Sequence, residues 1–478
     1  MLFNSFEFAV FIPVVFIIYW FLLKKSIKLQ NVFLLISSYV FYGWWDWRFL
    51  GLILFSSIVD YSIGHYLGKT DRGLTRKTLL AISLTLNLGL LGFFKYFNFF
   101  IESFNDTMRF FGNTFDVATL NIILPVGISF YTFQTLSYTI DVYNRKLEPA
   151  KDIVSFFTYV SFFPQLVAGP IERATNLLPQ FYRKRVFEYD FAVSGLKLIL
   201  WGLFKKIVIA DNAATFANII FANTDNYSGS TIFLGVILFS FQIYGDFSGY
   251  SDIAIGTSRL FGFKLMRNFA FPYFSRDIAE FWRRWHISLS TWFRDYLYIP
   301  LGGSRGGQWQ KIRNTFIIFV VSGFWHGANW TFISWGFLNA LFFLPLLMLK
   351  RNRVNTDLVA ENKLFPNLRE LFQMLATFML VNFAWIFFRA DSMSHAAQIY
   401  AKVASSSLFT VPELMPTKVI VLIIIFVAVE WFRRDREVVL DFSDWRIPRL
   451  VRYVIYYLII ASIFLVGGQQ QEFIYFQF

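Results

Sequence analysis

Long apolar runs follow one another along most of this 478-residue chain, and each is separated from the next by a short polar segment. A helix needs roughly 20 mainly apolar residues to cross the hydrocarbon core of a membrane. The candidate runs are 6–23, 31–47, 49–66, 78–101, 121–143, 191–221, 231–249, 314–325, 329–349, 371–388, 417–432 and 450–467. They predict an all-α, polytopic transmembrane bundle of about 11–13 spans. The short run 314–325 predicts a half-helix, and 153–169, with Lys151 before it and Arg173 after it, predicts a re-entrant segment.

The composition agrees with a membrane protein. Hydrophobic residues make up 56% of the chain and charged residues only 16%, whereas soluble domains are about 25% charged. The 63 Phe and 15 Trp residues are more than one soluble core could bury, but they can face lipid. The net charge of +13 comes from short Lys/Arg clusters between apolar runs, a pattern typical of membrane loops. We therefore expect contact with membrane lipid and no binding of nucleic acid.

The distribution of basic residues predicts the orientation of the chain. Basic clusters occur in every second loop: Lys24/Lys25/Lys28, Lys69/Arg72/Arg76/Lys77, Arg145/Lys146/Lys151, Lys350/Arg351/Arg353 and Arg433/Arg434/Arg436. The positive-inside rule assigns these loops to the cytoplasm and both termini to the outside. Residues 1–23 contain no Lys or Arg, so the first run reads as an uncleaved span. No internal repeat or linker is apparent, and we predict a single integral-membrane domain over residues 1–478.

One connection, residues 264–313, is neither a clean span nor an ordinary polar loop. From Arg276 to Arg313 it has seven Lys/Arg residues against three acids, interleaved with Trp, Phe and Tyr. The pattern predicts an interfacial helix on the cytosolic side, with aromatic rings at headgroup level. The same basic collar could hold an anionic donor, because arginine pairs with phosphate oxygens through a bidentate fork.

The sequence has four histidines and no cysteine, which excludes a Cys–acyl intermediate. His65 and His395 lie at an interface and in a polar loop, whereas His286 lies in the aromatic-basic segment. His326 stands between two apolar runs, where an ionisable side chain is costly and usually faces a cavity or the bundle interior. It is either a histidine hydrogen-bonded between helices or a neutral general base. Gly323 and Gly327 would permit a helix break or tight packing beside it.

Other motifs give weaker signals. His286 and His326 are 40 residues apart without a zinc-type ligand spacing, so we expect no metal site. No Gly-x-Ser-x-Gly elbow supports serine catalysis. The segment Tyr244–Asp252, at the inner end of a predicted span, brings two carboxylates (Asp246 and Asp252) to a cavity or to a helix end. The Pro and Gly residues of 163–173 suit a re-entrant turn.

Several of these motifs, taken in order, resemble the membrane-bound O-acyltransferase family, and most strongly between residues 121 and 340. The matching segments are LPVGISFYTF (124–133), FPQLVAGPI (163–171), DFSGYSD (246–252), the block 281–295 and FWHG (324–327). Within the family the chain is most similar to the bacterial alginate O-acetyltransferase branch, including the closing FIYFQF (473–478).

The resemblance implies transmembrane helices and re-entrant pieces around a central tunnel, in the bacterial inner membrane. It implies that His326 is the catalytic histidine and that His286 occupies a second polar position, often Asn, Asp or His in relatives. The implied reaction moves an acetyl group from cytosolic acetyl-CoA, or another acyl thioester, to a secreted or cell-surface polysaccharide such as alginate. No tightly bound cofactor is expected, and exported acetyltransferase-like proteins are expected as partners. Candidate donor or substrate contacts are Arg283, Arg284, Trp285, Arg294, Asp246 and Asn329.

Three other functions remain open at this point. A D-alanyl transfer enzyme of the teichoic-acid type shares the fold and the histidine, but takes its acyl group from a carrier protein. A transporter would need broken helices in matched halves and carboxylates within its spans, for which Asp246 and Asp252 are the candidates. A non-catalytic scaffold of polysaccharide export would need neither histidine.

Overall fold

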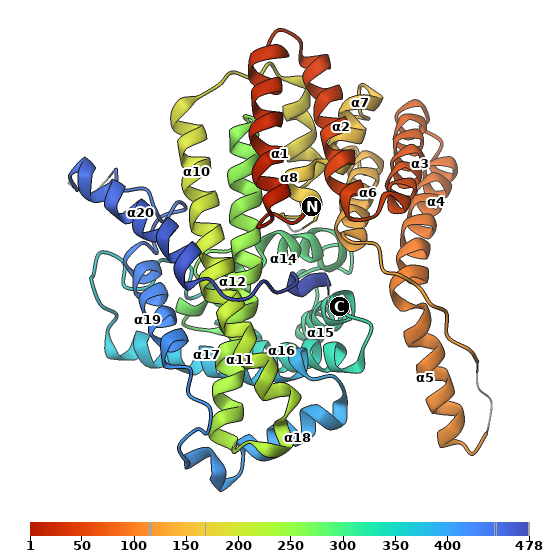
Figure 1. Ribbon diagram of the computed structural model, residues 1–478. Coiled ribbons are helices and arrows are strands. Elements are labelled where there is room, and N and C mark those ends of the chain that lie inside the picture. The colour runs from red at the N-terminus through yellow and green to blue at the C-terminus, as the bar shows by residue number, and fades with distance from the viewer. Residues whose placement is uncertain (114–116, 168, 444, 446, 477–478) are drawn as a thin grey trace. The chain divides into compact units, whose positions relative to one another are not determined.

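The protein is described by a computed structural model that covers residues 1–113, 117–167, 169–443, 445 and 447–476. Within these residues every regular element is helical. The α-helices are α1 (Phe6–Ile17), α2 (Ile27–Asp46), α3 (Leu50–Lys69), α4 (Gly73–Leu91), α5 (Phe97–Phe110), α6 (Ile128–Tyr143), α7 (Ile153–Ser161), α8 (Phe163–Leu166), α9 (Ala174–Leu177), α10 (Tyr189–Leu203), α11 (Asp211–Ala222), α12 (Gly229–Leu260), α13 (Ile278–Arg284), α14 (Ile287–Phe293), α15 (Gln308–His326), α16 (Trp330–Met348), α17 (Leu368–Arg389), α18 (Met393–Val403), α19 (Thr417–Phe432) and α20 (Arg449–Val466). Figure 1 shows them. The π-helical turns η1 (Ile18–Leu22), η3 (Gly92–Tyr96), η5 (Phe204–Ala210) and η8 (Arg294–Tyr298) interrupt or extend the longer helices.

Six helical segments of the described chain are long and apolar enough to cross a membrane. They are Ile27–Lys69, Gly73–Phe110, Gly229–Leu260, Trp330–Met348, Leu368–Arg389 and Arg449–Val466. Phe6–Leu22 and Ile153–Leu166 are shorter apolar helices. The prediction of an all-α, multi-pass membrane fold is therefore confirmed. The central tunnel implied by the resemblance remains a prediction.

The chain divides into two compact units. The first comprises Met1–Val193 with Thr257–Met266, and the second comprises Ser194–Gly256 with Arg267–Phe478. The chain passes from one unit to the other three times, within α10, within α12 and between Met266 and Arg267. Both predicted histidine positions belong to the second unit.

Two predicted spans differ from the structure near proline or polar residues. The run 121–143 is helical only from Ile128, because Pro125 lacks a backbone donor and Gly127 adopts φ +76° just before the helix. The run 231–249 is part of a 32-residue helix, so Asp246 and Asp252 lie inside α12 and not at the inner end of a span.

The predicted re-entrant segment consists of two short helices, α7 and α8. They meet at Phe162, which is not helical (ψ 107°) and precedes a helix that carries Pro164 in its first turn. Ala168, within the predicted segment, lies outside the described residues, as do residues 114–116 between two predicted spans and residues Gln477 and Phe478 of the closing motif.

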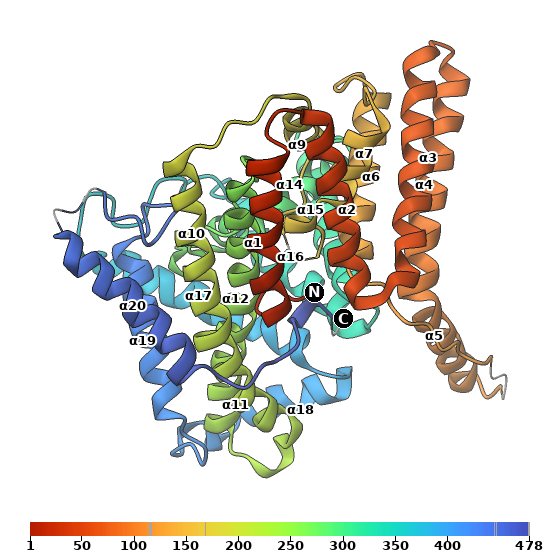
Figure 2. The ribbon, with the colours of Figure 1, turned by 45° about the horizontal axis from the view of Figure 1, so that its top comes forward.

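In the first unit, α3 and α4 form an antiparallel pair, seen side by side in Figures 1 and 2, and α6 packs against both. The carboxylate of Asp60 on α3 is fully buried at this junction. It accepts hydrogen bonds from Ser83 Oγ (2.5 Å), Asn87 Nδ2 (2.8 Å) and Thr139 Oγ1 (2.8 Å). Polar side chains that bond across apolar helices hold them together, because the alternative is an unpaired group in hydrocarbon.

We expect Asp60→Ala to destabilise the first unit. Three interhelical hydrogen bonds at about 0.6 kcal/mol each in a membrane protein amount to about 2 kcal/mol. The thermal unfolding midpoint of the detergent-purified protein should therefore fall. Asp71→Ala is the matched control, since that carboxylate is 90% exposed in its pair with Arg145 and should change the midpoint little. An unchanged midpoint for Asp60→Ala would exclude this role.

Candidate active site

The close packing of α15 on α16 fixes the end of α15, where His326 lies. A Cβ added to Gly323 would collide with the Phe332 carbonyl, and one added to Gly336 would collide with the Phe319 carbonyl. Glycine at both positions lets the two backbones touch, as small residues do between membrane helices. The prediction that Gly323 permits tight packing beside the imidazole is therefore confirmed.

His326 is the last residue of α15 and is 3% exposed. Aromatic rings enclose its imidazole. The ring centres of Trp325, Trp335, Phe388 and Tyr475 lie 5.0, 5.2, 5.3 and 5.6 Å from that of His326. The imidazole of His286 lies 6.5 Å away, centre to centre. The two histidines that stand 40 residues apart in the sequence are thus neighbours in an apolar pocket of the second unit.

The segment around His286 differs from the single interfacial helix predicted for it. It forms two seven-residue helices, α13 and α14, that meet at Trp285 and His286. His286 has φ +42° and ψ +55°, a left-handed conformation that Asn, Asp and His tolerate better than other residues with a Cβ. This turn separates the helices and points the buried imidazole toward α15.

A hydrogen-bonding cluster sets the tautomer of His286. Asn268 Oδ1 accepts hydrogen bonds from the backbone N–H (3.2 Å) and hydroxyl (2.9 Å) of Ser288, which identifies that atom as the oxygen of the amide. His286 Nδ1 lies 3.1 Å from the same oxygen, so Nδ1 must carry the hydrogen and donate it. In the neutral imidazole Nε2 is then an acceptor, and among the described residues it has no hydrogen-bond partner.

Burial keeps His286 neutral. The absence of water around the ring lowers its pKa from about 6.5 to about 3. His286 lies outside the long apolar helices, between α13 and α14. Because the pKa is lower in the folded protein, protonation favours unfolding, and the contribution of His286 to stability is lost as the pH falls from about 6.5 toward 3. At neutral pH the lone pair of Nε2 is buried and has no hydrogen-bond partner among the described residues, so it is available to a substrate proton.

A buried charge cluster connects the C-terminal segment, residues 467–476, to the same region. Lys206 Nζ pairs with Asp211 (2.7 Å) and Asp246 (2.9 Å). The same ammonium donates to the Gln471 carbonyl (3.0 Å), and Asp246 Oδ2 accepts from the Ile474 N–H (2.7 Å). Figures 1 and 2 both show the segment crossing α12. Asp246, predicted as a substrate contact, is thus engaged with Lys206 and with this segment.

The cluster holds Tyr475 beside both histidines. Phe473 packs on Tyr250 in a tilted arrangement (4.4 Å between ring centres), and Tyr475 packs on Phe247 (4.4 Å) and lies edge-on to His286 (6.4 Å). Tyr475 therefore adds a phenol ring to the wall of the histidine pocket, from a part of the chain about 150 residues beyond His326.

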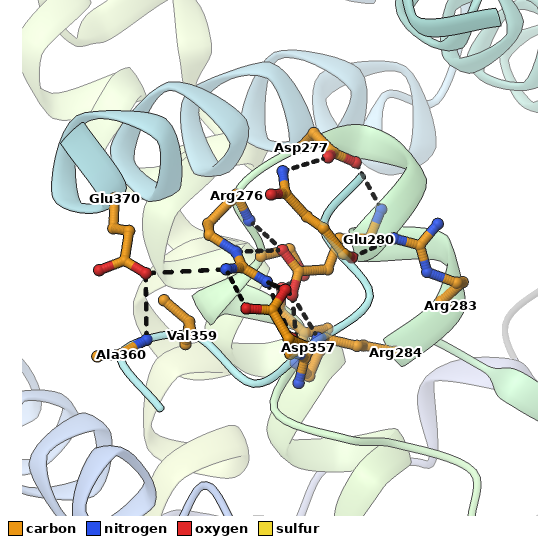
Figure 3. A network of polar contacts seen from close by, with 12 residues as sticks. Arg276, Asp277, Glu280, Arg283, Arg284, Asp357, Val359, Ala360 and Glu370 are labelled. Atoms are coloured by element: carbon orange, nitrogen blue, oxygen red, sulfur yellow. Dashed lines mark hydrogen bonds and ion pairs between the residues drawn. The ribbon is translucent and has the colours of Figure 1, made fainter. Parts of the chain in front are cut away.

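The predicted basic collar contains a network that is internally neutralised (Figure 3). Arg276, 5% exposed at its side chain, is bound by Glu280 (3.1 Å), Asp357 (3.0 Å) and Glu370 (3.7 Å). Arg284 donates to Glu280 (2.7 Å) and to the Asp357 carbonyl (3.2 Å). The hydrogen bond from Arg276 lowers the pKa of Asp357 below its ordinary value. This network attaches the loop between α16 and α17 to α13.

The other candidate contacts fall into distinct roles. Arg283 donates to the carbonyls of Asn352 (2.9 Å) and Asn355 (2.5 Å) of the same loop. Trp285 is 1% exposed and stacks among aromatic rings such as Phe269 and Trp385. Asn329 caps α16 by accepting from the Thr331 N–H (3.0 Å). These contacts occupy the polar atoms of Arg283 and Asn329 with protein partners.

Arg294 also has a protein partner, since its Nε donates to Asp295 Oδ1 (2.8 Å), and its side chain lines a cavity. The cavity has a volume of about 230 Å³, with Trp282, Phe319 and Tyr298 in its wall and Arg353 as a second guanidinium. Ser322, one helical turn before His326 on α15, also lines it. An apolar cavity with two arginines, adjoining the helix of the candidate base, suits a ligand that is apolar at one end and anionic at the other.

Sequence reasoning did not find Asn268, Lys206 or the location of Tyr475. Lys206 and Asp246 are ionisable groups of opposite charge inside apolar runs, a signal that could have paired them. Asn268 offers no such signal, since its contact with His286 depends on the turn between α13 and α14. Within the described residues, no three His, Asp or Glu side chains lie close enough together to hold a metal ion.

Comparison with known proteins defines the class. Residues 47–384 match the sequence profile of the membrane-bound O-acyltransferase family, and this span contains both histidines and the α15–α16 pair. The chain belongs to the membrane-bound O-acyltransferase family, and it is an O-acyltransferase.

Three relatives illustrate its similarities. A protein of Azotobacter vinelandii named "probable alginate O-acetylase" is 41% identical over 388 residues, covering 81% of this chain and 75% of the relative. The peptidoglycan O-acetyltransferase of Helicobacter pylori is 37% identical, covering 84% and 79%. The teichoic acid D-alanyltransferase of Streptococcus thermophilus is 31% identical over a shorter alignment, which covers 47% of this chain and 57% of the relative.

Substitutions at His286 should distinguish the contribution of its side chain to acyl transfer from that of its left-handed backbone conformation. The left-handed conformation costs Ala about 1–2 kcal/mol, whereas Gly adopts it freely and Asn tolerates it. If the hydrogen-bonding side chain matters, acyl transfer should be retained best by His286→Asn and fall together in His286→Gly and His286→Ala. Equal activity of the Asn and Gly variants would mean that only the backbone conformation is needed.

Proposed function

We propose that this protein transfers an acetyl group from cytosolic acetyl-CoA across the membrane, for the O-acetylation of a secreted or cell-surface polysaccharide. The names of the relatives that align over most of the chain support acetyl transfer to a polymer such as alginate. The observation that carries the proposal is the buried pair His326–His286, 6.5 Å apart at the end of α15, in an O-acyltransferase.

In the proposed step, His326 is the general base. Its imidazole takes the proton of an acceptor hydroxyl as the hydroxyl oxygen attacks the acyl carbon of the thioester. The carbon–sulfur bond then breaks, and the imidazolium of His326 gives its proton to the departing thiolate, so that a thiol leaves and the imidazole is neutral again. The enclosure of His326 by four aromatic rings supports this role, because burial favours the uncharged imidazole, which is the form that can accept a proton.

Of the two roles open to His286, positioning of a reacting group and polarisation of the thioester carbonyl, the geometry supports positioning. Polarisation of a carbonyl would need an N–H donor, but Nδ1–H is bound to Asn268 and Nε2 bears a lone pair. We therefore propose that His286 accepts a hydrogen bond at Nε2 and positions a protonated group, either the acceptor hydroxyl or the departing thiol. The direct and relayed routes of transfer both remain compatible with this assignment.

The cavity lined by Arg294 and Arg353 is the proposed donor contact. Guanidinium groups bind phosphate oxygens, and the aromatic wall suits the less polar arm of a thioester donor. Arg283 and Arg284 are bound to the loop after α16 and to Glu280, which supports a positioning role for them rather than direct contact with the donor.

We further propose that the protein lies in the bacterial inner membrane with both termini outside, as the alternation of basic clusters indicates. In this orientation the donor arrives from the cytosol and the acceptor from the outside. Exported acetyltransferase-like proteins are the proposed partners that pass the group to the polymer.

The teichoic-acid D-alanyl transfer function is the main alternative. The match to the D-alanyltransferase of Streptococcus thermophilus is shorter and weaker than those to the acetyl-transferring relatives, which favours acetyl transfer. Detection of acetyl esters on exported polysaccharide would support our proposal, whereas D-alanyl esters would overturn it. In a transporter, Asp246 would have to be available to an ion, but it is paired with Lys206.

We expect His326→Ala to reduce acetyl transfer about 10²- to 10⁴-fold, the usual contribution of a positioned general base. The assay would follow labelled acetyl-CoA with the purified protein and its acceptor. His326→Gln keeps much of the side-chain volume and should be equally inactive. Near-normal transfer by a well-expressed variant would refute the assignment, and intact partner assembly with lost transfer would exclude a mere scaffold.

Charge reversal in the cavity should weaken donor binding. Arg294→Glu and Arg353→Glu should each raise the apparent KM for acetyl-CoA about tenfold, which corresponds to about 1.4 kcal/mol. Arg305→Glu, an exposed residue that does not line the cavity, makes the same change of charge and should leave KM within twofold. An unchanged KM in both cavity variants would remove these arginines from the donor site.

A further inference from the structure

A second cavity lies in the first unit, where the first apolar helix ends. Its volume is about 650 Å³. Phe16, Trp20, Phe21 and Phe187 form an aromatic wall, with ring centres of Phe187 at 5.5 Å from Trp20 and 5.9 Å from Phe16. Phe21 and Phe187 are exposed, at 69% and 45%. Phe21 lies in η1, and Phe187 lies in the segment just before α10. Exposed aromatic rings of a membrane protein are enriched at the membrane surface, where they face lipid.

The opposite part of the cavity is cationic. Lys24, Lys25 and Lys184 line it with exposed side chains, and their ammonium groups have no hydrogen bond or ion pair with any described residue. Arg185, which also lines the cavity, is buried and fixed by Asn31 Oδ1 (2.7 Å). No carboxylate lines the cavity. Its three available ammonium groups therefore favour an anion.

An exposed apolar stripe on the first helix leads to this cavity, and its length matches one leaflet of a lipid bilayer. Val10, Val14, Ile17 and Phe21 are 50%, 50%, 54% and 69% exposed. They are spaced by three or four residues, so they form one stripe along α1 and η1. From Val10 to Phe21 the stripe extends roughly 16 Å, close to half of the roughly 30 Å hydrocarbon core. It ends at Lys24 and Lys25, at headgroup level.

We propose that this cavity binds an anionic phospholipid, with its phosphodiester between Lys24, Lys25 and Lys184 and an acyl chain along the stripe of α1. A basic pocket at the end of a membrane helix recognises anionic headgroups, and lysine stems extend along apolar surface while their charges reach the phosphate. A soluble phosphate compound such as acetyl-CoA would use the ammonium groups but leave the apolar stripe without a partner. The lipid belongs to the leaflet on the side of the basic clusters.

Lipid binding to the purified full-length protein, measured by native mass spectrometry, tests this site. The probes are phosphatidylglycerol, phosphatidylcholine and acetyl-CoA. The variant Lys24→Gln/Lys25→Gln/Lys184→Gln should bind phosphatidylglycerol at least tenfold more weakly, with binding of phosphatidylcholine and acetyl-CoA unchanged. The matched control Lys69→Gln/Arg72→Gln/Lys77→Gln removes the same charge from another exposed cluster and should stay within twofold of the unmodified protein.

Three results would overturn the proposal. The first is unchanged phosphatidylglycerol binding in the cavity variant. The second is an equal loss of binding in the control variant, which would indicate a diffuse basic surface. The third is a loss of acetyl-CoA binding in the cavity variant, which would assign the ammonium groups to the donor. Phe187→Ala, which leaves every charge in place, provides a second measurement. It should weaken phosphatidylglycerol binding at least threefold if the aromatic wall holds the chain, and no change would contradict the lipid assignment.

Discussion

An ammonium group buried among aromatic rings is destabilising by several kilocalories per mole unless opposite charges and dipoles surround it. Lys206, 1% exposed at its side chain, is surrounded by the carboxylates of Asp211 and Asp246 and by the Gln471 carbonyl. These partners come from α11, from the middle of α12 and from the segment after α20. One buried charge thus determines where three distant parts of the chain must meet, and the histidine pocket of the second unit is assembled beside them.

The π-helical turn η5 contributes to this arrangement. It lies between α10 and α11 and contains both Lys205 and Lys206, which pair with Asp252 (2.7 Å) and Asp246 (2.9 Å) on α12. Consecutive residues of a regular helix point about 100° apart, yet here two adjacent lysines reach partners on the same helix. Such single-turn widenings are frequent at functional sites. The π-helical distortion of η5 thus occurs where Lys205 and Lys206 pair with the carboxylates of α12.

The sequence predicts the class of fold because apolar length is a local property, readable in each run by itself. It predicts less where conformation depends on a single residue. Gly127 delays the start of α6. The left-handed turn at His286 divides the interfacial helix that the interleaved aromatic and basic residues predict. The sequence predicts Asp246 at the inner end of a span, at a cavity or at a helix end, but its partner Lys206 allows it to lie inside α12. The contact of Asn268 with His286 exists only after folding, so no pattern of residues indicates it.

The aromatic enclosure of His326 has a consequence for the choice between competing nucleophiles. Water is about 55 molar in bulk and is small enough to enter any polar site, so an activated thioester beside a basic imidazole would normally be hydrolysed. The rings of Trp325, Trp335, Phe388 and Tyr475 surround the imidazole mainly with aromatic carbon, whereas an ordered water needs two to four hydrogen-bonding partners. Selectivity for an alcohol over water would then result from this aromatic surrounding, because an alcohol reaches the imidazole only when its own binding places it there.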